Sequence, residues 1–414
     1  MRDDLKLLLS CYACEPNRGS EPGVGWAWAL GMAKRHETWI LTRANNRSAI
    51  EIELDRLGIP EPERPRFVYV DLPKWLRCLK KSRVVPVSLY YLLWQFAARR
   101  AWDRSGVRVD VIHHVTFNSF VVPGVWWRRE EKVVLGPLGG MSVCPRQYLR
   151  CFPGSARFRE AIRGFTRRLW KLDRFFVRSR AFADVVVYTT REMFQTMDDG
   201  RGRARVLLET AVPDALIRRP PPVVRQGSAS RRFVWAGTLA GHKAGEIAIR
   251  AFVRAFGTSA EPPVLDMFGS GPDESNWKTL SRNLHADSFI RFRGSVSQAE
   301  LWKEMSEATA LFFTSVRDTS GNVVLEALAC GTPVVCFKHQ GVAEIVDDTC
   351  SIMIEPTGWD ETVDLFARAL RRLDADSVFR NKLATEARNR AVSCFQWDAK
   401  FNEFDRIYYR LVHH

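Results

Sequence analysis

The sequence predicts an α/β protein with two Rossmann-like domains joined by a linker. Short apolar runs alternate with helical patterns through the first half of the chain, and the same alternation restarts in the second half. Between the halves, residues 216–232 include three consecutive prolines followed by Gly, Ser and Arg without hydrophobic periodicity. A chain of 414 residues is too long for one ordinary core and suits two domains of roughly 200 residues each. We therefore expect domains at residues 1–215 and 233–395, with residues 216–232 as the linker.

Six buried strands are predicted in the first domain. Their apolar runs are residues 5–13, 38–42, 66–72, 109–115, 132–136 and 184–190. Near-continuous apolar runs of this length are typical of parallel strands that helices cover on both faces.

The second domain repeats this pattern. Its apolar runs are residues 233–237, 264–269, 290–294, 310–315, 333–337 and 351–355. Residues 396–414 then alternate aromatic and charged positions with a helical period, so the chain is expected to close with an amphipathic helix.

Composition narrows the class of protein. Hydrophobic residues make up 46% of the chain, which suits a globular protein, and no run of 18 apolar residues is present to span a membrane. The first residues, "MRDDLK", place two acids where a signal peptide needs positive charge. The nine cysteines are an odd number without a repeated spacing, so we interpret them as reduced thiols in a cytoplasmic protein.

The net charge of +15 is concentrated in two segments. Residues 74–104 hold eight Lys or Arg against one acid (+7), and residues 145–180 hold eleven against two (+9). The second segment has a helical period that separates an apolar face from a basic face. The apolar face consists of Phe158, Ile162, Phe165, Leu169, Leu172 and Phe176, and the basic face of Arg159, Arg163, Arg167, Lys171, Arg174 and Arg178.

Three interpretations of these basic segments remain open. The first is a solvated helix that packs its apolar face on the core. The second is contact with anionic lipid headgroups, or with a phosphate-bearing acceptor at a membrane surface. Nucleic acid is ranked last, because no recognisable binding module accompanies the charge.

The most informative stretch is "RDTSGNVVLEALACGTPVV", residues 317–335. Asp318 and Glu326 flank a glycine turn that opens onto a helix, and the next apolar run follows directly. The free N–H groups and positive dipole of a helix start favour a bound phosphate, and the nearby acids could hold hydroxyl groups. An ordinary loop, helix and strand would give a similar pattern.

This stretch resembles the retaining glycosyltransferases of family four, which have an acid, seven residues and a second acid at this place. The resemblance implies the GT-B fold, with two Rossmann-like domains facing each other across a cleft and the final helix, 396–414, packed back onto the first domain. It also implies that Asp318 holds hydroxyls of the donor sugar and that Glu326 holds the ribose of the nucleotide. Where that family usually has Glu, this chain has Asp318, which is one methylene shorter. The backbone contacts to the donor would come from Ser320, Gly321, Asn322 and Val323.

The resemblance covers nearly the whole chain, in order. In "VWAGTLAGHKAGE", Lys243 occupies the position of a lysine that clamps the diphosphate, whereas Thr238 stands where an arginine is usual. We expect another cation, His242 or an arginine of the first domain, to replace that arginine. Further donor contacts are implied for Gly269 and Gly271 and for Arg293 and Gly294, around the nucleotide base.

The first domain carries a glycine-rich loop, "GSEPGVG", between a strand and a helix. Glycine allows a backbone to approach a diphosphate without a Cβ clash, and Gly23 and Gly25 are expected to contact the donor. Glu21 is a candidate contact to the acceptor or sugar. The histidine that is usual in this domain of the family is absent, and His114, at the end of a predicted strand, is the candidate substitute.

No metal signature is evident, because the only D-x-D, residues 374–376, lies far from every motif above. We expect neither a metal nor a cofactor. The interpretation is a cytoplasmic enzyme, peripheral on the inner face of the membrane, that moves a sugar with retention from a nucleotide-sugar to a glycan or lipid-linked acceptor. Such a reaction would serve bacterial exopolysaccharide or lipopolysaccharide synthesis. Alternatives are a weakly active or inactive nucleotide-sugar-binding protein and a GT-B phosphorylase or epimerase.

Overall fold

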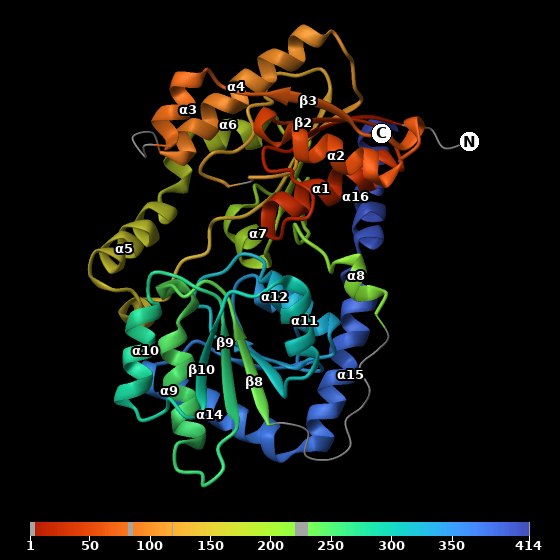
Figure 1. Ribbon diagram of the computed structural model, residues 1–414. Coiled ribbons are helices and arrows are strands. Elements are labelled where there is room, and N and C mark those ends of the chain that lie inside the picture. The colour runs from red at the N-terminus through yellow and green to blue at the C-terminus, as the bar shows by residue number, and fades with distance from the viewer. Residues whose placement is uncertain (1–4, 82–85, 118, 220–230, 414) are drawn as a thin grey trace. The chain divides into compact units, whose positions relative to one another are not determined.

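The computed structural model describes residues 5–81, 86–117, 119–219 and 231–413. It contains two compact units, each an α/β fold around a wholly parallel sheet (Figure 1). Unit 1 comprises Met1–Met141, Leu169–Thr210 and Trp397–His414, and unit 2 comprises Ser142–Arg168 and Ala211–Gln396. The chain therefore has the two Rossmann-like domains that its alternating pattern predicts.

The sheet of unit 1 has seven strands in the order β3-β2-β1-β4-β5-β6-β7. Their bounds are Lys6–Ser10 (β1), Glu37–Arg43 (β2), Arg66–Val70 (β3), Val111–His114 (β4), Lys132–Leu138 (β5), Val185–Tyr188 (β6) and Ala204–Val206 (β7). Six of them overlap the predicted apolar runs. The edge strand β7 was not predicted, because its three residues are too few and too exposed to form an apolar run.

Helices cover both faces of this sheet. They are Ser20–Ala33 (α1), Arg47–Leu57 (α2), Lys74–Lys81 (α3), Val87–Ser105 (α4), Arg174–Phe182 (α6), Arg191–Met197 (α7) and Trp397–His413 (α16). Trp28 of α1, Ile50 of α2 and Phe404 of α16 join one core cluster. The cluster on the opposite face includes Trp94 of α4 and Phe176 of α6. The C-terminal helix α16 thus packs within unit 1, against α1.

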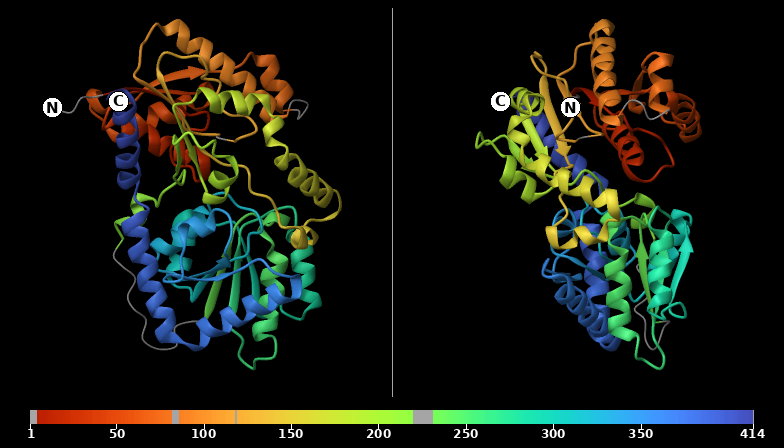
Figure 2. Two further views of the ribbon diagram at one scale, coloured as in Figure 1. Left: turned by 180° about the vertical axis from the view of Figure 1, so that it is seen from behind. Right: turned by 90° about the vertical axis from the view of Figure 1, so that its left-hand side faces the viewer.

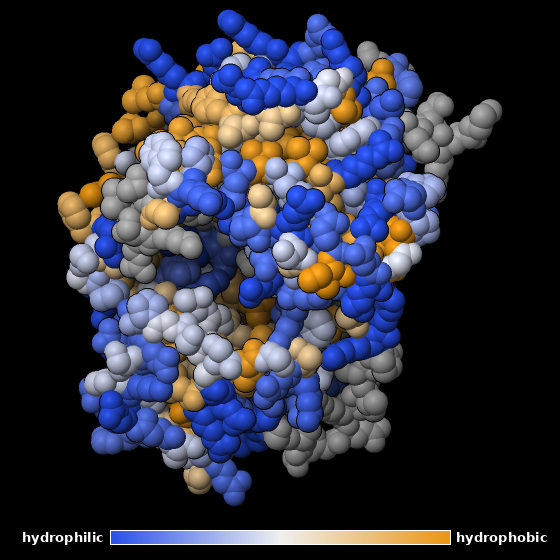
Figure 3. All heavy atoms as spheres, turned by 45° about the horizontal axis from the view of Figure 1, so that its top comes forward, coloured by the Kyte–Doolittle hydropathy of each residue, from blue (hydrophilic) through white to orange (hydrophobic). Residues whose placement is uncertain are grey.

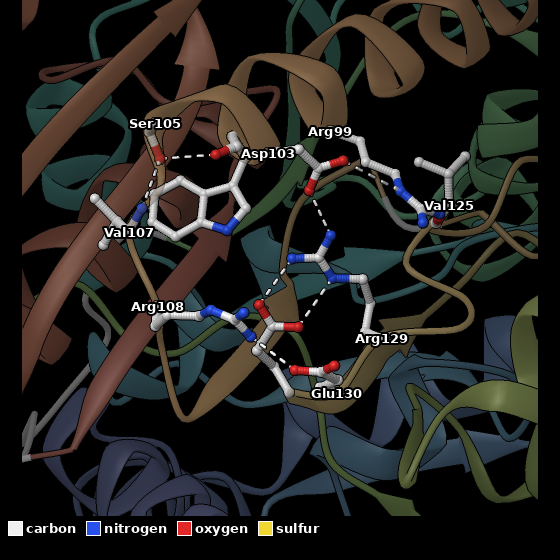
Figure 4. A network of polar contacts seen from close by, with 10 residues as sticks. Arg99, Asp103, Ser105, Val107, Arg108, Val125, Arg129 and Glu130 are labelled. Atoms are coloured by element: carbon white, nitrogen blue, oxygen red, sulfur yellow. Dashed lines mark hydrogen bonds and ion pairs between the residues drawn. The ribbon is translucent and has the colours of Figure 1, made fainter.

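A network of ion pairs ties the end of α4 to the segment before β5 (Figure 4). Arg129 binds both carboxylate oxygens of Glu131, at 2.7 and 3.0 Å, and also pairs with Asp103. Arg108 pairs with Glu130 at 2.7 Å. A cavity of about 440 Å³ lies among these groups, and two arginines along it, Arg108 and Arg129, have carboxylate partners of their own. We therefore infer that this network stabilises unit 1.

The sheet of unit 2 has six strands in the order β10-β9-β8-β11-β12-β13. Their bounds are Arg232–Ala236 (β8), Val264–Phe268 (β9), Ile290–Gly294 (β10), Ala310–Phe313 (β11), Val334–Phe337 (β12) and Ser351–Ile354 (β13). Each overlaps its predicted run.

The helices of unit 2 also pack in two layers, which Figure 2 shows from behind and from the side. They are Gly154–Arg168 (α5), Asp214–Ile217 (α8), Gly245–Phe256 (α9), Glu274–Asn283 (α10), Gln298–Ser306 (α11), Asn322–Ala329 (α12), Val342–Ile345 (α13), Trp359–Ala375 (α14) and Ser377–Cys394 (α15). α9 packs against α10 and α14, and α12 packs against α11 and α15. Two buried aromatic side chains, Phe252 of α9 and Phe366 of α14, belong to the main core cluster of this unit.

The domain boundaries differ from the expected ones in two segments, residues 142–168 and 211–215. Residues 142–168 cluster with unit 2, although they precede the last strands of unit 1 in the sequence. Tyr148 explains part of this, because its buried hydroxyl binds Thr357 O at 3.0 Å and Thr362 Oγ1 at 2.7 Å. Residues 220–230 of the expected linker lie outside the described residues, whereas Leu216 belongs to α8 and Arg232 begins β8.

The basic helix expected in residues 145–180 is two helices, α5 and α6. Asp173 begins the second, because its side chain accepts hydrogen bonds from the N–H groups of Phe175 and Phe176. The interpretation in which the apolar face packs on the core does not hold for α5. Phe158 and Phe165 of α5 are 69% and 63% exposed, whereas Arg163 and Arg167 of the same helix are partly buried.

All nine cysteines are free. In the part of the chain that is described, no helix is both long and apolar enough to cross a membrane.

Candidate active site

The candidate site in unit 2 lies where the strands β8 and β11 are neighbours in the sheet. From β8 the chain continues to β9 on one side, and from β11 it continues to β12 on the other, so the loops after these two strands diverge. Open parallel sheets bind ligands at such a point, outside the carboxyl ends of the strands. Lys243 follows β8 and Asp318 follows β11, so the topology brings these two predicted residues together.

Lys243 and Asp318 form an ion pair that is mostly shielded from solvent. The Lys243 ammonium contacts Asp318 Oδ2, and the two side chains are 19% and 17% exposed. Asp318 Oδ1 accepts hydrogen bonds from Thr319 N at 2.9 Å and Gly321 N at 3.3 Å. Burial by itself would raise the pKa of Asp318, but the Lys243 charge and these N–H groups outweigh it and hold the pKa below its ordinary value. The Asp318 carboxylate is therefore ionised at neutral pH.

The start of α12 lies directly after this pair. Gly321 precedes the helix with φ = 57°, in the left-handed region that favours glycine. Ser320 leads into this turn, and Asn322 and Val323 are the first helical residues, each partly exposed. Their N–H groups belong to the first turn, which has no intrahelical partners. Asn322 Oδ1 is buried and has no hydrogen-bond partner among the described residues.

Glu326 lies one turn further along α12, on its partly exposed side. Gln298 at the start of α11 donates a hydrogen bond to Glu326 Oε1 at 2.8 Å. Burial raises the pKa of Glu326, and the Gln298 hydrogen bond opposes part of that shift. A carboxylate held in this way can accept hydrogen bonds from hydroxyl groups.

Backbone hydrogen bonds join the loops after β8, β9 and β10 into one platform. Leu239 N donates to Ser270 O at 3.0 Å, and Gly269 N donates to Gly294 O at 2.8 Å. Gly269 is needed for this packing, since a Cβ there would lie 1.9 Å from Gly237 O, and a Cβ on Gly271 would lie 2.4 Å from Leu239 O. The predicted donor residues of these loops therefore shape the platform.

Arg293 and Thr238 lie exposed on this platform. Arg293 is 3.8 Å from the buried Asp266 carboxylate. Thr238 carries no charge, so the cation that the resemblance places there is absent from that position.

His242, one expected replacement, is neutral at physiological pH. Burial, and then the charges of Arg317 and Lys243, lower its pKa to about 4.

Supporting residues that the sequence analysis missed hold Asp318 in place. The Asp318 N–H donates to Gln340 Oε1 at 3.0 Å, and Gln340 Nε2 donates to Val143 O at 2.8 Å. Ser142 Oγ donates to Asp318 O at 2.9 Å. Gln340 follows β12, so its place after a strand is a weak signal, but nothing in the sequence indicates that residues 142 and 143 reach this loop.

The glycines of the predicted loop in unit 1 have a structural explanation. A Cβ on Gly23 would lie 2.1 Å from Arg18 O, and a Cβ on Gly25 would lie 2.0 Å from Ala13 O. The loop before α1 folds back onto the helix at these two positions, which leaves no room for a side chain. Contact of Gly23 and Gly25 with a donor remains a proposal.

Glu21 lies in the first turn of α1, and its carboxylate accepts a hydrogen bond from Phe117 N–H. Burial raises the pKa of Glu21 to about 7; the Phe117 hydrogen bond opposes this shift and the Glu209 charge adds to it. Glu21 is thus the acid of this loop whose charge changes near neutral pH.

Glu21 predicts a pH dependence of stability. Between the unfolded pKa of about 4.5 and the folded pKa of about 7, the native state retains a proton that the unfolded chain loses. The free energy of unfolding should therefore fall by about 3 kcal/mol as the pH rises through this window. Urea titrations at several pH values should show this slope in the wild type and a flatter one in Glu21→Gln. The exposed Glu61→Gln should keep the wild-type slope; a slope shared by all three proteins would refute the assignment.

The structure shows the surroundings of His114, and its expected sugar contact stays a prediction. Its side chain is completely buried in unit 1, and Nε2 lies 2.8 Å from the Tyr91 hydroxyl. Burial, and then the neighbouring His113, lowers the pKa of His114 to about 3, so the ring is neutral. Because β4 is a central strand with helices on both faces, its last side chain packs among residues of the core.

Within the described parts of the chain, no cluster of three or more His, Cys, Asp or Glu side chains could hold a metal ion.

Comparison with known proteins shows which family this part of the chain is similar to. Residues 225–390 match the model of the glycosyl transferases group 1, and Lys243, Asp318 and Glu326 all fall within the matched range. The D-inositol 3-phosphate glycosyltransferase of Streptomyces bingchenggensis is 30% identical over 208 residues, which is 48% of this chain and 41% of that protein. The lipopolysaccharide core biosynthesis glycosyltransferase LpsE of Rhizobium meliloti is 28% identical over 135 residues, 33% of this chain and 38% of LpsE. The aligned segments thus span about two fifths of these relatives.

The fold is similar over almost the whole chain to a solved structure. Sucrose-phosphate synthase from Thermosynechococcus elongatus superposes with a TM-score of 0.64 and 16% identity, covering 98% of this chain and 99% of that one. At this identity the likeness shows the fold alone.

Proposed function

We propose that this chain, which has the GT-B fold and a group 1 glycosyltransferase domain at residues 225–390, transfers a sugar from a nucleotide-sugar to a hydroxyl acceptor. The observation that carries the proposal is the Lys243–Asp318 ion pair beside the start of α12, with Glu326 one turn along the same helix. This arrangement offers a cation and a helix dipole for a diphosphate, and two carboxylates for hydroxyl groups.

In the proposed reaction, Lys243 and the first N–H groups of α12 stabilise the charge that develops on the leaving diphosphate. Glu326 accepts hydrogen bonds from the ribose, and Asp318 from hydroxyls of the sugar. Neither acid attacks the sugar. The acceptor hydroxyl attacks from the face that the diphosphate leaves, and the diphosphate takes up its proton, so the anomeric configuration is retained. The proposal assigns no step to a metal or a cofactor.

The test of this function uses a panel of UDP-, GDP- and ADP-sugars, with membrane extract as the source of acceptors. Release of a nucleoside diphosphate, together with a product heavier by one sugar, would support transfer, and proton NMR of the product would give the anomeric configuration. Tight binding of a nucleotide-sugar without turnover would instead favour a binding protein. Sugar 1-phosphate formed from phosphate and a glycan would favour a phosphorylase, and a donor converted without any acceptor would favour an epimerase.

We further propose that the acceptor is lipid-linked and that unit 1 binds an anionic membrane surface on the cytoplasmic side. Support comes from α4, which has apolar residues on two faces. Tyr91, Trp94 and Trp102 are buried, whereas Leu89 and Phe96 are 47% and 43% exposed. Trp75 of α3 is 62% exposed. Figure 3 shows hydrophobic side chains grouped at the upper left of that view. Exposed Lys74, Arg100 and Arg104 add positive charge to these helices. The similarity to LpsE is compatible with a role in lipopolysaccharide or exopolysaccharide synthesis.

This surface predicts a measurable change in vesicle binding. The double variant Trp75→Ser/Leu89→Ser should bind phosphatidylglycerol-containing vesicles about tenfold more weakly, since two large apolar side chains no longer enter the interface. Flotation on sucrose gradients measures the effect. Val378→Ser, which alters an exposed apolar residue of unit 2, should float like the wild type. Wild-type protein that does not float, or that floats equally with neutral phosphatidylcholine vesicles, would contradict the proposal.

A further inference from the structure

Helix α5 turns two arginines of its basic face inward and leaves its apolar face in solvent. Phe158, Ile162 and Phe165 are 69%, 45% and 63% exposed. Arg163 and Arg167, on the other side of the helix, are only partly exposed. A helix that packed for hydrophobic burial alone would have the opposite orientation, so the inward arginines call for another explanation.

The arginines of α5 meet a further arginine from the candidate active site. Arg317, which directly precedes Asp318, has its Nε 3.1 Å from Oε1 of Glu160, a residue of α5 that is 6% exposed. Arg163 and Arg167 interact electrostatically with the same carboxylate and with Arg317. The buried Glu160 carboxylate therefore interacts with three guanidinium groups.

The cluster carries an excess of positive charge in a partly dehydrated place. Burial, and then repulsion by Arg163 and Arg317, lowers the pKa of Arg167 to about 10, although Glu160 acts in the opposite direction. Burial, and then the charges of Arg317, Lys243 and Arg163, likewise lower the pKa of His242. Gathering like charges away from water is unfavourable unless an anion compensates them.

A cavity of about 620 Å³ lies beside this cluster, entirely within unit 2. Its lining includes Phe152, Arg159, Arg163, His242, Asp273 and Arg317, which come from α5, the segment before it, and the loops after β8, β9 and β11. The volume is within the usual range for small-molecule sites. Through the chain neighbours His242 and Arg317, the cavity adjoins the Lys243–Asp318 pair.

We propose that this cavity binds a phosphoryl group, carried by the donor diphosphate or by the acceptor, and that Arg163 and Arg317 are its principal ligands. The identity of these two carriers, donor and acceptor, rests on the proposed function. In this proposal, an arginine of α5 and an arginine of the loop after β11 supply the positive charge that is missing at Thr238. Guanidinium groups suit this task, because their planar N–H groups bind phosphate oxygens in pairs.

Binding of inorganic phosphate, of pyrophosphate and of UDP, measured by calorimetry, tests the proposal without requiring turnover. Arg163→Gln and Arg317→Gln change two ligands on separate elements. Arg168→Gln is the matched control, since Arg168 lies on the same helix but is exposed and outside the cavity lining. We expect each ligand variant to weaken pyrophosphate binding about tenfold or more, and the control to change it less than twofold.

Thermal melting distinguishes lost binding from lost folding. Removing one of several like charges should leave the melting temperature of ligand-free Arg163→Gln unchanged or higher, while the stabilisation by pyrophosphate is lost. Phosphate that still binds in the presence of saturating UDP, and is lost in Arg163→Gln, would identify the acceptor as the carrier. Competition between phosphate and UDP, with both weakened by the variant, would identify the donor.

Equal pyrophosphate binding by the wild type, both ligand variants and the control would overturn the proposal, as would no binding by any of the four. Normal phosphate binding by a protein that transfers no sugar would leave this site intact and refute the proposed function instead.

Discussion

Lys243→Ala lowers kcat/KM for sugar transfer by about 10²–10³-fold, the loss expected when one preorganised positive donor is removed from a developing anion. Lys243 is the only cationic side chain bound to Asp318 among the described residues, and it lies where β8 and β11 meet. The reaction needs charge stabilisation most as the diphosphate leaves. Steady-state kinetics with the donor identified by the nucleotide-sugar panel measures the effect.

Lys278→Ala is the matched control for this loss. Lys278 is also a lysine of unit 2 and pairs with a carboxylate, Glu274, at 2.7 Å, but the pair lies on the exposed side of α10. Its removal should change kcat/KM less than twofold. Transfer that is unaffected by Lys243→Ala would show that the leaving group is stabilised elsewhere in the chain.

The second large effect is on the free energy of unfolding, to which Lys243 and Asp318 are expected to contribute jointly. Removing Lys243 alone takes the ammonium partner away from the Asp318 carboxylate, which is only 17% exposed. This loss should lower the free energy of unfolding by about 3 kcal/mol. The double variant Lys243→Ala/Asp318→Asn should recover most of that cost, because the uncompensated charge is gone. Urea unfolding of the four proteins gives a coupling energy of about 2–3 kcal/mol. Transfer activity should stay lost in the double variant.

A double-mutant cycle on the exposed pair Lys278–Glu274 provides the reference. Its coupling should be about 0.3–0.5 kcal/mol, as for other solvated pairs spaced by one helical turn. If the losses in the free energy of unfolding of the two single variants simply added up in the double variant, the two charges would not stabilise each other. Recovery of activity together with stability would mean that Lys243 only supports the fold.

The sheets could be predicted from the sequence because their strands are buried on both faces. Runs such as "ALFFTS" and "PVVCF" need no knowledge of distant residues to be identified as strands, and they overlap β11 and β12. The edge strand β7 lacks this signal, since its three residues are half-exposed. The pairing of Lys243 with Asp318 also follows from local pattern, once the loops of a parallel sheet are known to end at one edge.

Features that depend on long-range packing could not be predicted. The amphipathic pattern of α5 gives the two faces of the helix correctly but not which face turns inward, because that choice depends on Arg317, over 150 residues later. The same holds for His114, because the sequence does not show that Tyr91 and the surrounding core enclose its ring. Gln340 and Ser142 support Asp318 from segments that the sequence pattern does not connect to it.

A crystal structure of the protein with the nucleoside diphosphate of its donor tests the location of the donor site most directly. We expect the diphosphate within hydrogen-bonding distance of Lys243 Nζ and the N–H groups of Asn322 and Val323, and a ribose hydroxyl on Glu326. A nucleotide that binds elsewhere, with the Lys243–Asp318 pair and the start of α12 empty, would contradict the account.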